Sequence, residues 1–99
     1  MVSVSPVLLA SENFRESAIV NLKQIWRSKE FTDVTLVSSE GFRLEAHKTV
    51  LSSSSDFFRG ILIENQHPSV LLYMKGVAYK ELELLLELIY TGECQVRKI

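Results

Sequence analysis

The sequence contains few of the residues that build metal sites, disulfides or phosphate-binding loops. It has one cysteine, Cys94, and two histidines, His47 and His67, and neither histidine has further ligands at metal-binding spacing. The four glycines lie too far apart to cradle a phosphate. We therefore expect no metal, no cofactor and no disulfide within the chain, and a reducing compartment, either the cytosol or the nucleus.

The chain also lacks a surplus of positive charge. It has 11 Lys and Arg against 12 Asp and Glu, and its net charge is −1. Domains that bind phosphate backbones gather Lys and Arg on one face, so direct binding of nucleic acid is not expected. Residues 1–6 lack the basic region of a signal peptide, and no apolar run is long enough to cross a bilayer. We predict a soluble intracellular protein that does not contact membranes.

Catalytic motifs are missing as well. The serines at 52–55 do not belong to a Gly-x-Ser-x-Gly turn, and consecutive serines between short helices are typical of helix capping. A chain of 99 residues would also have to form a pocket around any nucleophile. We therefore predict that the protein is not an enzyme.

What the sequence does contain is typical of one small globular domain. Its 99 residues are 46% hydrophobic, which predicts a single domain over residues 1–99. Small domains bury a low fraction of their surface, so a partner often adds to their stability. Oligomerisation is therefore expected.

Hydrophobic periodicity predicts an α+β fold. Strands are predicted at residues 2–9, 31–37, 42–46, 70–74 and 93–97. The run at 70–74 is continuously apolar, as expected for a strand covered on both faces. Helices are predicted over 14–29, 47–51 and 79–90, and a further short helix is predicted to begin at a cap formed by Ser55 or Asp56. Asn13 and Glu16 are expected to form a capping box at the start of the first helix. The serine run is expected to end the second helix, and Gly92 the last.

Two features leave alternatives open. Asp33 lies in a β-branched segment, where it either points to solvent beside Phe31 and Thr35 on an edge strand or pairs with a cation such as Lys48. The apolar stripe of the first helix, which ends at Trp26, either packs within the chain or docks on a second copy.

Four segments together resemble the BTB/POZ domain in order and spacing. They are Phe31-Thr32-Asp33-Val34-Thr35-Leu36, Ala46-His47-Lys48-Thr49-Val50-Leu51-Ser52, Ser55-Asp56-Phe57-Phe58 and Leu88-Ile89-Tyr90-Thr91-Gly92-Glu93. His67-Pro68 followed by residues 70–77 is most similar to the tramtrack group of insect BTB domains, which head transcription regulators.

The resemblance implies a small mixed sheet flanked by helices and a homodimer formed through the first helix. The expected dimer interface comprises Phe14, Ala18, Ile19, Leu22, Ile25 and Trp26, with paired charges at Asp33 and Lys48. The family's exchange of an N-terminal strand would involve Val2, Val4 and Val7 of one subunit and Cys94 and Val96 of the other. Family members continue beyond the position of Ile99, so the family's C-terminal helices are expected to be missing.

The function implied by the resemblance is protein–protein interaction. We expect homodimerisation or higher oligomerisation of a transcription regulator in the nucleus, with other BTB proteins and corepressors as further partners. The alternative is a substrate adaptor of a cullin-type ubiquitin ligase, in which Phe58, Leu62 and Glu64 would contact the cullin. The cytoplasm is the alternative location.

Overall fold

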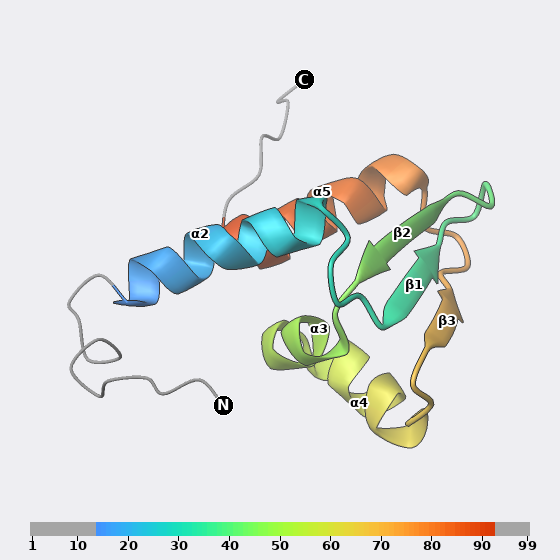
Figure 1. The fold of residues 1–99 in the computed structure, drawn as a ribbon. Helices are drawn as coiled ribbons and strands as arrows, with labels where there is room; N and C mark the ends of the chain where they lie inside the picture. The colour runs from blue at the N-terminus through green and yellow to red at the C-terminus, as the bar shows by residue number, and fades with distance from the viewer. Residues whose placement is uncertain (1–13, 93–99) are drawn as a thin grey trace.

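The computed structural model describes residues 14–92 of the 99, and their side chains from residue 16 onward. Four helices and three strands form an α+β fold, as predicted (Figure 1). In chain order they are α2 (Phe14–Arg27), β1 (Val34–Val37), β2 (Arg43–Ala46), α3 (Lys48–Ser54), α4 (Asp56–Glu64), β3 (Val70–Tyr73) and α5 (Tyr79–Thr91). None of these helices is long and apolar enough to span a membrane.

The three strands form a mixed sheet with the order β2-β1-β3. The central strand, β1, runs antiparallel to β2, with Leu36 opposite Leu44, and parallel to β3, with Leu36 opposite Leu72. Side chains of alternate residues point to opposite faces. The inward face therefore carries Val34 and Leu36, while β2 and β3 each leave one edge without a strand partner among residues 14–92.

The core lies between one face of this sheet and the helices. Its buried side chains are Val34, Leu36, Ala46, Leu51, Phe58, Leu62, Val70, Leu82, Leu86 and Tyr90. On the opposite face Leu71 and Tyr73 are more than half exposed. The prediction that β3 is covered on both faces is therefore wrong for the single chain, because the helices cover only the face that carries Val70 and Leu72.

Two predicted boundaries also differ from the structure. Phe31 adopts a left-handed backbone, with φ 59°, so the chain turns there and β1 begins only at Val34. Helix α3 continues through the serines to Ser54, whose hydroxyl donates to the carbonyl of Val50 at 2.9 Å. The hydroxyls thus bond back along the helix, as Ser53 also does to Thr49, and do not end it.

The junctions of the helices agree better with the sequence. Ser55 caps α4 as predicted, since its Oγ accepts a hydrogen bond from the N–H of Phe58 at 3.4 Å. Gly92, with φ 79°, ends α5, and its N–H donates to the carbonyl of Leu88 at 2.8 Å. This left-handed position favours glycine because a Cβ would be strained there.

Candidate protein-interaction surface

The expected dimer helix, α2, divides into a packed half and an exposed half. Its C-terminal half packs on the core through Leu22 and Trp26, alongside α5. In its N-terminal half Ala18 is exposed, and the side chains of Ile19 and Val20 are 58% and 62% exposed. Figure 1 shows this half extending beyond the end of α5. The exposed apolar surface of α2 therefore lies before Leu22.

The other predicted members of this interface are placed less simply. Ile25 is half-buried, and Val20, which the resemblance did not include, is more exposed than Ile19. The side chain of Phe14 lies outside the described residues, as do Asn13 and the strand-exchange residues Val2, Val4, Val7, Cys94 and Val96. Their predicted roles stay predictions.

Trp26 is an anchor within the chain. Its indole stacks on the ring of Tyr90, with centroids 4.8 Å apart and planes inclined by 8°. Tyr90 is a buried core residue of α5. Of the two readings of the apolar stripe, packing within the chain therefore holds for Trp26, because the stack joins α2 to the core.

Tyr90 also takes part in a buried hydrogen-bond network with His47. The main-chain N–H of His47 donates to Tyr90 Oη at 2.8 Å, and His47 Nδ1 lies 2.7 Å from the same oxygen. His47 Nε2 lies 2.6 Å from the carbonyl oxygen of Glu30. Because a carbonyl only accepts, Nε2 carries the proton, and Nδ1 accepts from the tyrosine hydroxyl in the neutral ring. The network ties together the end of α2, the start of α3 and the end of α5.

The environment of Tyr90 changes its acidity. Burial raises the pKa of Tyr90 to about 12, and the nearby charge of Asp33 adds to the shift, although the hydrogen bond from His47 opposes it. The hydroxyl therefore stays protonated at neutral pH and can donate to His47. As predicted, His47 opens a helix, since it occupies the N-cap position of α3.

Asp33 and Lys48 lie in contact, but within residues 14–92 their charged groups do not form an ion pair. Asp33 Oδ1 accepts a hydrogen bond from the main-chain N–H of Lys48 at 2.7 Å. The ammonium of Lys48 instead donates to the main-chain carbonyl of His67. Asp33 precedes the central strand, so the reading of a solvent-facing residue on an edge strand is wrong. The carboxylate caps α3, whose N-cap residue, His47, makes no side-chain capping bond.

The residues expected to contact a cullin are largely unavailable. Phe58 and Leu62 are 2% and 5% exposed and belong to the core, and of the three only Glu64 is exposed. Phe58 and Leu62 lie one helical turn apart on α4, so the helix face that carries these two side chains packs inward. Phe58 and Leu62 therefore offer little surface to a partner, whereas Phe57 and Ile63 of α4 are exposed; the predicted cullin contact stays a prediction.

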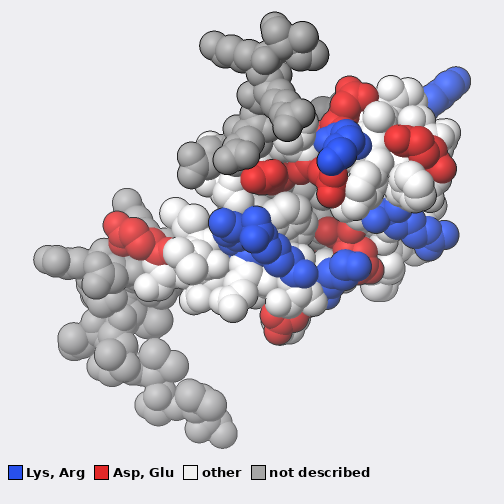
Figure 2. Space-filling model, turned by 90° about the horizontal axis from the view of Figure 1, so that it is seen from above, with Lys and Arg blue, Asp and Glu red and all other residues white. Residues whose placement is uncertain are grey.

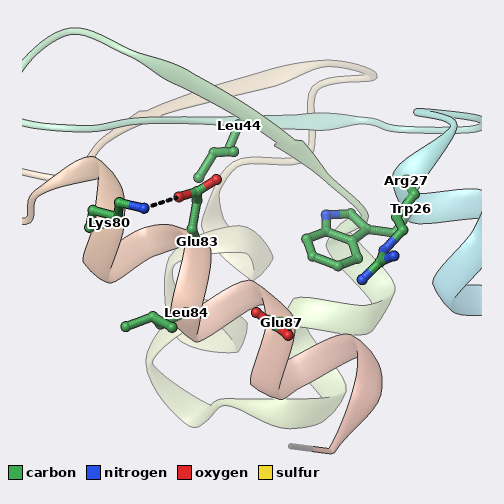
Figure 3. Close-up of a pocket in the computed structure, with 7 residues that line it drawn as sticks. All are labelled: Trp26, Arg27, Leu44, Lys80, Glu83, Leu84 and Glu87. Atoms are coloured by element: carbon green, nitrogen blue, oxygen red, sulfur yellow. Dashed lines mark ion pairs between the residues drawn. The ribbon is translucent and has the colours of Figure 1, made fainter. Parts of the chain in front are cut away.

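A groove between α2, β2 and α5 was missed from the sequence. Its larger hollow, of about 320 Å³, is lined by Trp26, Arg27, Leu44, Lys80, Glu83, Leu84 and Glu87. Figure 3 shows Trp26 and Arg27 on one side and the α5 residues on the other. The spacing of Lys80, Glu83, Leu84 and Glu87 places them on one helix face, but the other two walls come from distant segments. Periodicity alone could not predict the groove.

Comparison with known proteins assigns the family. The family model "BTB/POZ domain" matches residues 22–99. In Drosophila melanogaster, sex determination protein fruitless is 40% identical over 75 residues, covering 76% of this chain and 8% of its own length. Longitudinals lacking protein-like is 35% identical over 96 residues, covering 97% of this chain and 75% of its own length.

Two further comparisons support the expected group and the fold. Protein tramtrack, alpha isoform, of the same organism is 33% identical over 84 residues, covering 85% of this chain and 10% of its own length. The solved BTB domain of zebrafish PATZ1 matches with a TM-score of 0.75 at 22% identity, covering 98% of this chain and 75% of that one. The resemblance to the tramtrack group is confirmed. The chain belongs to the BTB/POZ domain family, whose members are protein-interaction domains and generally not enzymes.

Proposed function

We propose that this domain associates with itself through the exposed half of α2, as the oligomerisation module of a nuclear transcription regulator. The observation that carries the proposal is the pair Ile19 and Val20, which are adjacent, apolar and each more than half exposed. Single exposed apolar residues are common, but an uncovered stretch on a projecting helix is typical of an interface. A second copy of the same helix would cover it.

The way in which α2 is fixed supports this proposal. The Trp26–Tyr90 stack and the packing of Leu22 hold the C-terminal half against the core. The N-terminal half continues a helix that is fixed at its other end, so we expect little conformational entropy to be lost when it docks. Ala18, which is small and exposed, allows two helices to approach closely at this position.

The role in transcription is supported by the relatives. Fruitless and tramtrack are far longer than this chain, which spans 8% and 10% of them. We propose that the domain supplies self-association, while DNA recognition belongs to other parts of such a protein. Other BTB proteins and corepressors are the further partners that this role implies.

Light scattering on the purified chain tests self-association. We expect a mass of twice 11.3 kDa or a larger multiple at micromolar concentration. A monodisperse species of 11.3 kDa at that concentration would contradict the proposal.

A further inference from the structure

The outer edge of β2 has main-chain groups that are free to bond. The N–H of Ser38 donates to the carbonyl of Phe42 at 2.8 Å, so this pair carries β1–β2 hydrogen bonds. In an antiparallel ladder bonded pairs alternate with non-bonded pairs. Leu36 and Leu44 are therefore bonded, whereas the N–H and C=O groups of Arg43 and Glu45 point away from β1.

The bonds to β3 give the same alternation independently. The carbonyl of Asp33 accepts from Val70 at 3.1 Å, and that of Val37 accepts from Met74 at 2.8 Å. The main-chain N–H and C=O groups of odd-numbered β1 residues thus point toward β3. Those of even-numbered β1 residues are left to bond with β2. The outward direction of Arg43 and Glu45 is consistent with both ladders.

This edge opens on the groove described above. A second hollow, of about 220 Å³, shares Trp26, Arg27 and Leu44 with the larger one, so the two adjoin. The second hollow is also lined by Lys29, Arg43, Glu45 and Tyr79. We call the two hollows together the edge groove.

The charges of the edge groove are unevenly distributed. In the second hollow Arg27, Lys29 and Arg43 outnumber the single carboxylate of Glu45. In the larger hollow Lys80 is paired with Glu83 at 3.9 Å, and the apolar side chains of Leu44 and Leu84 line the wall. Figure 2 shows Lys and Arg side chains clustered near the middle of one face, with acidic side chains beside them. One end of the edge groove is basic, and the rest is mixed and partly apolar.

We propose that the edge groove binds an extended segment of a partner protein in which acidic residues alternate with apolar ones. The segment adds as a fourth strand to β2, bonding to the main chain of Arg43 and Glu45. Its acidic side chains meet Arg27, Lys29 and Arg43, and its apolar ones contact Trp26 and Leu44. This role goes beyond self-association, since it uses a surface other than the exposed half of α2.

An extended peptide suits this site better than a helix would. Only a strand satisfies the outward N–H and C=O groups of a sheet edge, and those groups give affinity for any sequence. The surplus of basic side chains then selects acidic segments, because opposite charges across an interface favour one partner over others. Backbone bonding and charge thus make separate contributions that an experiment can separate.

The test is an NMR titration of the isotope-labelled chain with the peptide Glu-Val-Glu-Leu-Asp-Val-Glu-Leu. We expect saturable shifts at the amides of Arg43 and Glu45 and at the indole of Trp26. The same peptide with lysine at its acidic positions should bind at least about tenfold more weakly. Absence of saturable shifts, equal binding of the two peptides, or shifts confined to residues 16–20 would each overturn the proposal.

Two substitutions at one position separate backbone from charge. Glu45→Gln removes the carboxylate and should tighten binding about twofold or more, because the edge groove becomes more basic. Glu45→Pro removes the same charge and also the outward N–H, and should weaken binding about tenfold or more. Proline is tolerated there because that N–H makes no bond to β1. Equal affinities of the two variants would overturn the strand addition.

Further variants keep the test decisive. If Glu45→Pro does not fold, Arg43→Glu should weaken binding about tenfold, whereas Lys75→Glu, which lies outside the edge groove, should not change it. Arg43→Glu that binds like the wild type would contradict the proposal. Light scattering of Glu45→Pro tests the alternative that the β2 edge serves self-association. If this variant forms a smaller assembly than the wild type, and the wild type does not bind the peptide, the β2 edge belongs to self-association and the proposal is overturned.

Discussion

The indole of Trp26 stacks on the phenol of Tyr90, with ring centroids 4.8 Å apart. Tyr90 in turn accepts a hydrogen bond from the main-chain N–H of His47 at 2.8 Å. Helix α2 is thereby joined to the core and to the start of α3. Because only the C-terminal half of α2 is fixed in this way, Ile19 and Val20 are left exposed.

Loss of the stack should destabilise the fold. Trp26→Ala removes a large, half-buried aromatic side chain, and we expect the free energy of unfolding to fall by about 2 kcal/mol. Ile63→Ala is the control, since an exposed residue outside the core should change stability by less than about 0.5 kcal/mol. Chemical denaturation at equal protein concentration measures both. Equal stabilities of the two variants would contradict the anchoring role of Trp26.

The carboxylate of Asp33 should act as a helix cap and not as an ion-pair partner. Asp33→Ala leaves the N–H of Lys48 without its acceptor and should cost about 1 kcal/mol of stability. Asp33→Asn keeps a hydrogen-bond acceptor and should therefore lose less stability than Asp33→Ala. Lys48→Met keeps the main-chain N–H and should also lose less than Asp33→Ala, as judged by thermal denaturation. A loss from Lys48→Met as large as that from Asp33→Ala would favour a charge pair instead.

Tyr90 should ionise only at strongly alkaline pH. Its pKa is raised to about 12 by burial, so its contribution to stability is complete below pH 10 and is lost as the pH rises toward 12. Burial, together with the charge of Glu83, also raises the pKa of Tyr79. Ultraviolet absorbance of tyrosinate, followed as the pH is raised, should show a transition toward pH 12 that the Tyr90→Phe variant lacks. A titration of Tyr90 near pH 10 in the folded protein would be inconsistent with its burial.

The regular elements could be predicted because local patterns determine them. The apolar periodicity of α5 and the glycine at position 92 give both its face and its end, and the residues of the β1–β2 hairpin alternate as strands do. The serine run could not be interpreted correctly, because serine either bonds back along a helix or ends it. The left-handed turn at Phe31 has no local signal, since a bulky residue rarely adopts it.

The interaction surface could be predicted only in part. Periodicity identifies the apolar stripe of α2 but not which half is covered, since that depends on the position of Tyr90, 64 residues beyond Trp26. The resemblance named Asp33 and Lys48 as paired charges of a dimer interface, but it gave no sign of the hydrogen bond from the main-chain N–H of Lys48 to Asp33 within the chain. The edge groove combines segments from α2, β2 and α5, so only the folded chain reveals it.

Sedimentation velocity of two matched variants tests the central claim most directly. Ile19 and Ile63 are 58% and 57% exposed, so replacing either with glutamate costs the folded monomer about the same. Ile19→Glu places a charge in the proposed α2 contact and should shift the assembly to a folded species of 11.3 kDa, whereas Ile63→Glu should keep the wild-type mass. A wild-type assembly that survives Ile19→Glu unchanged would contradict self-association through α2.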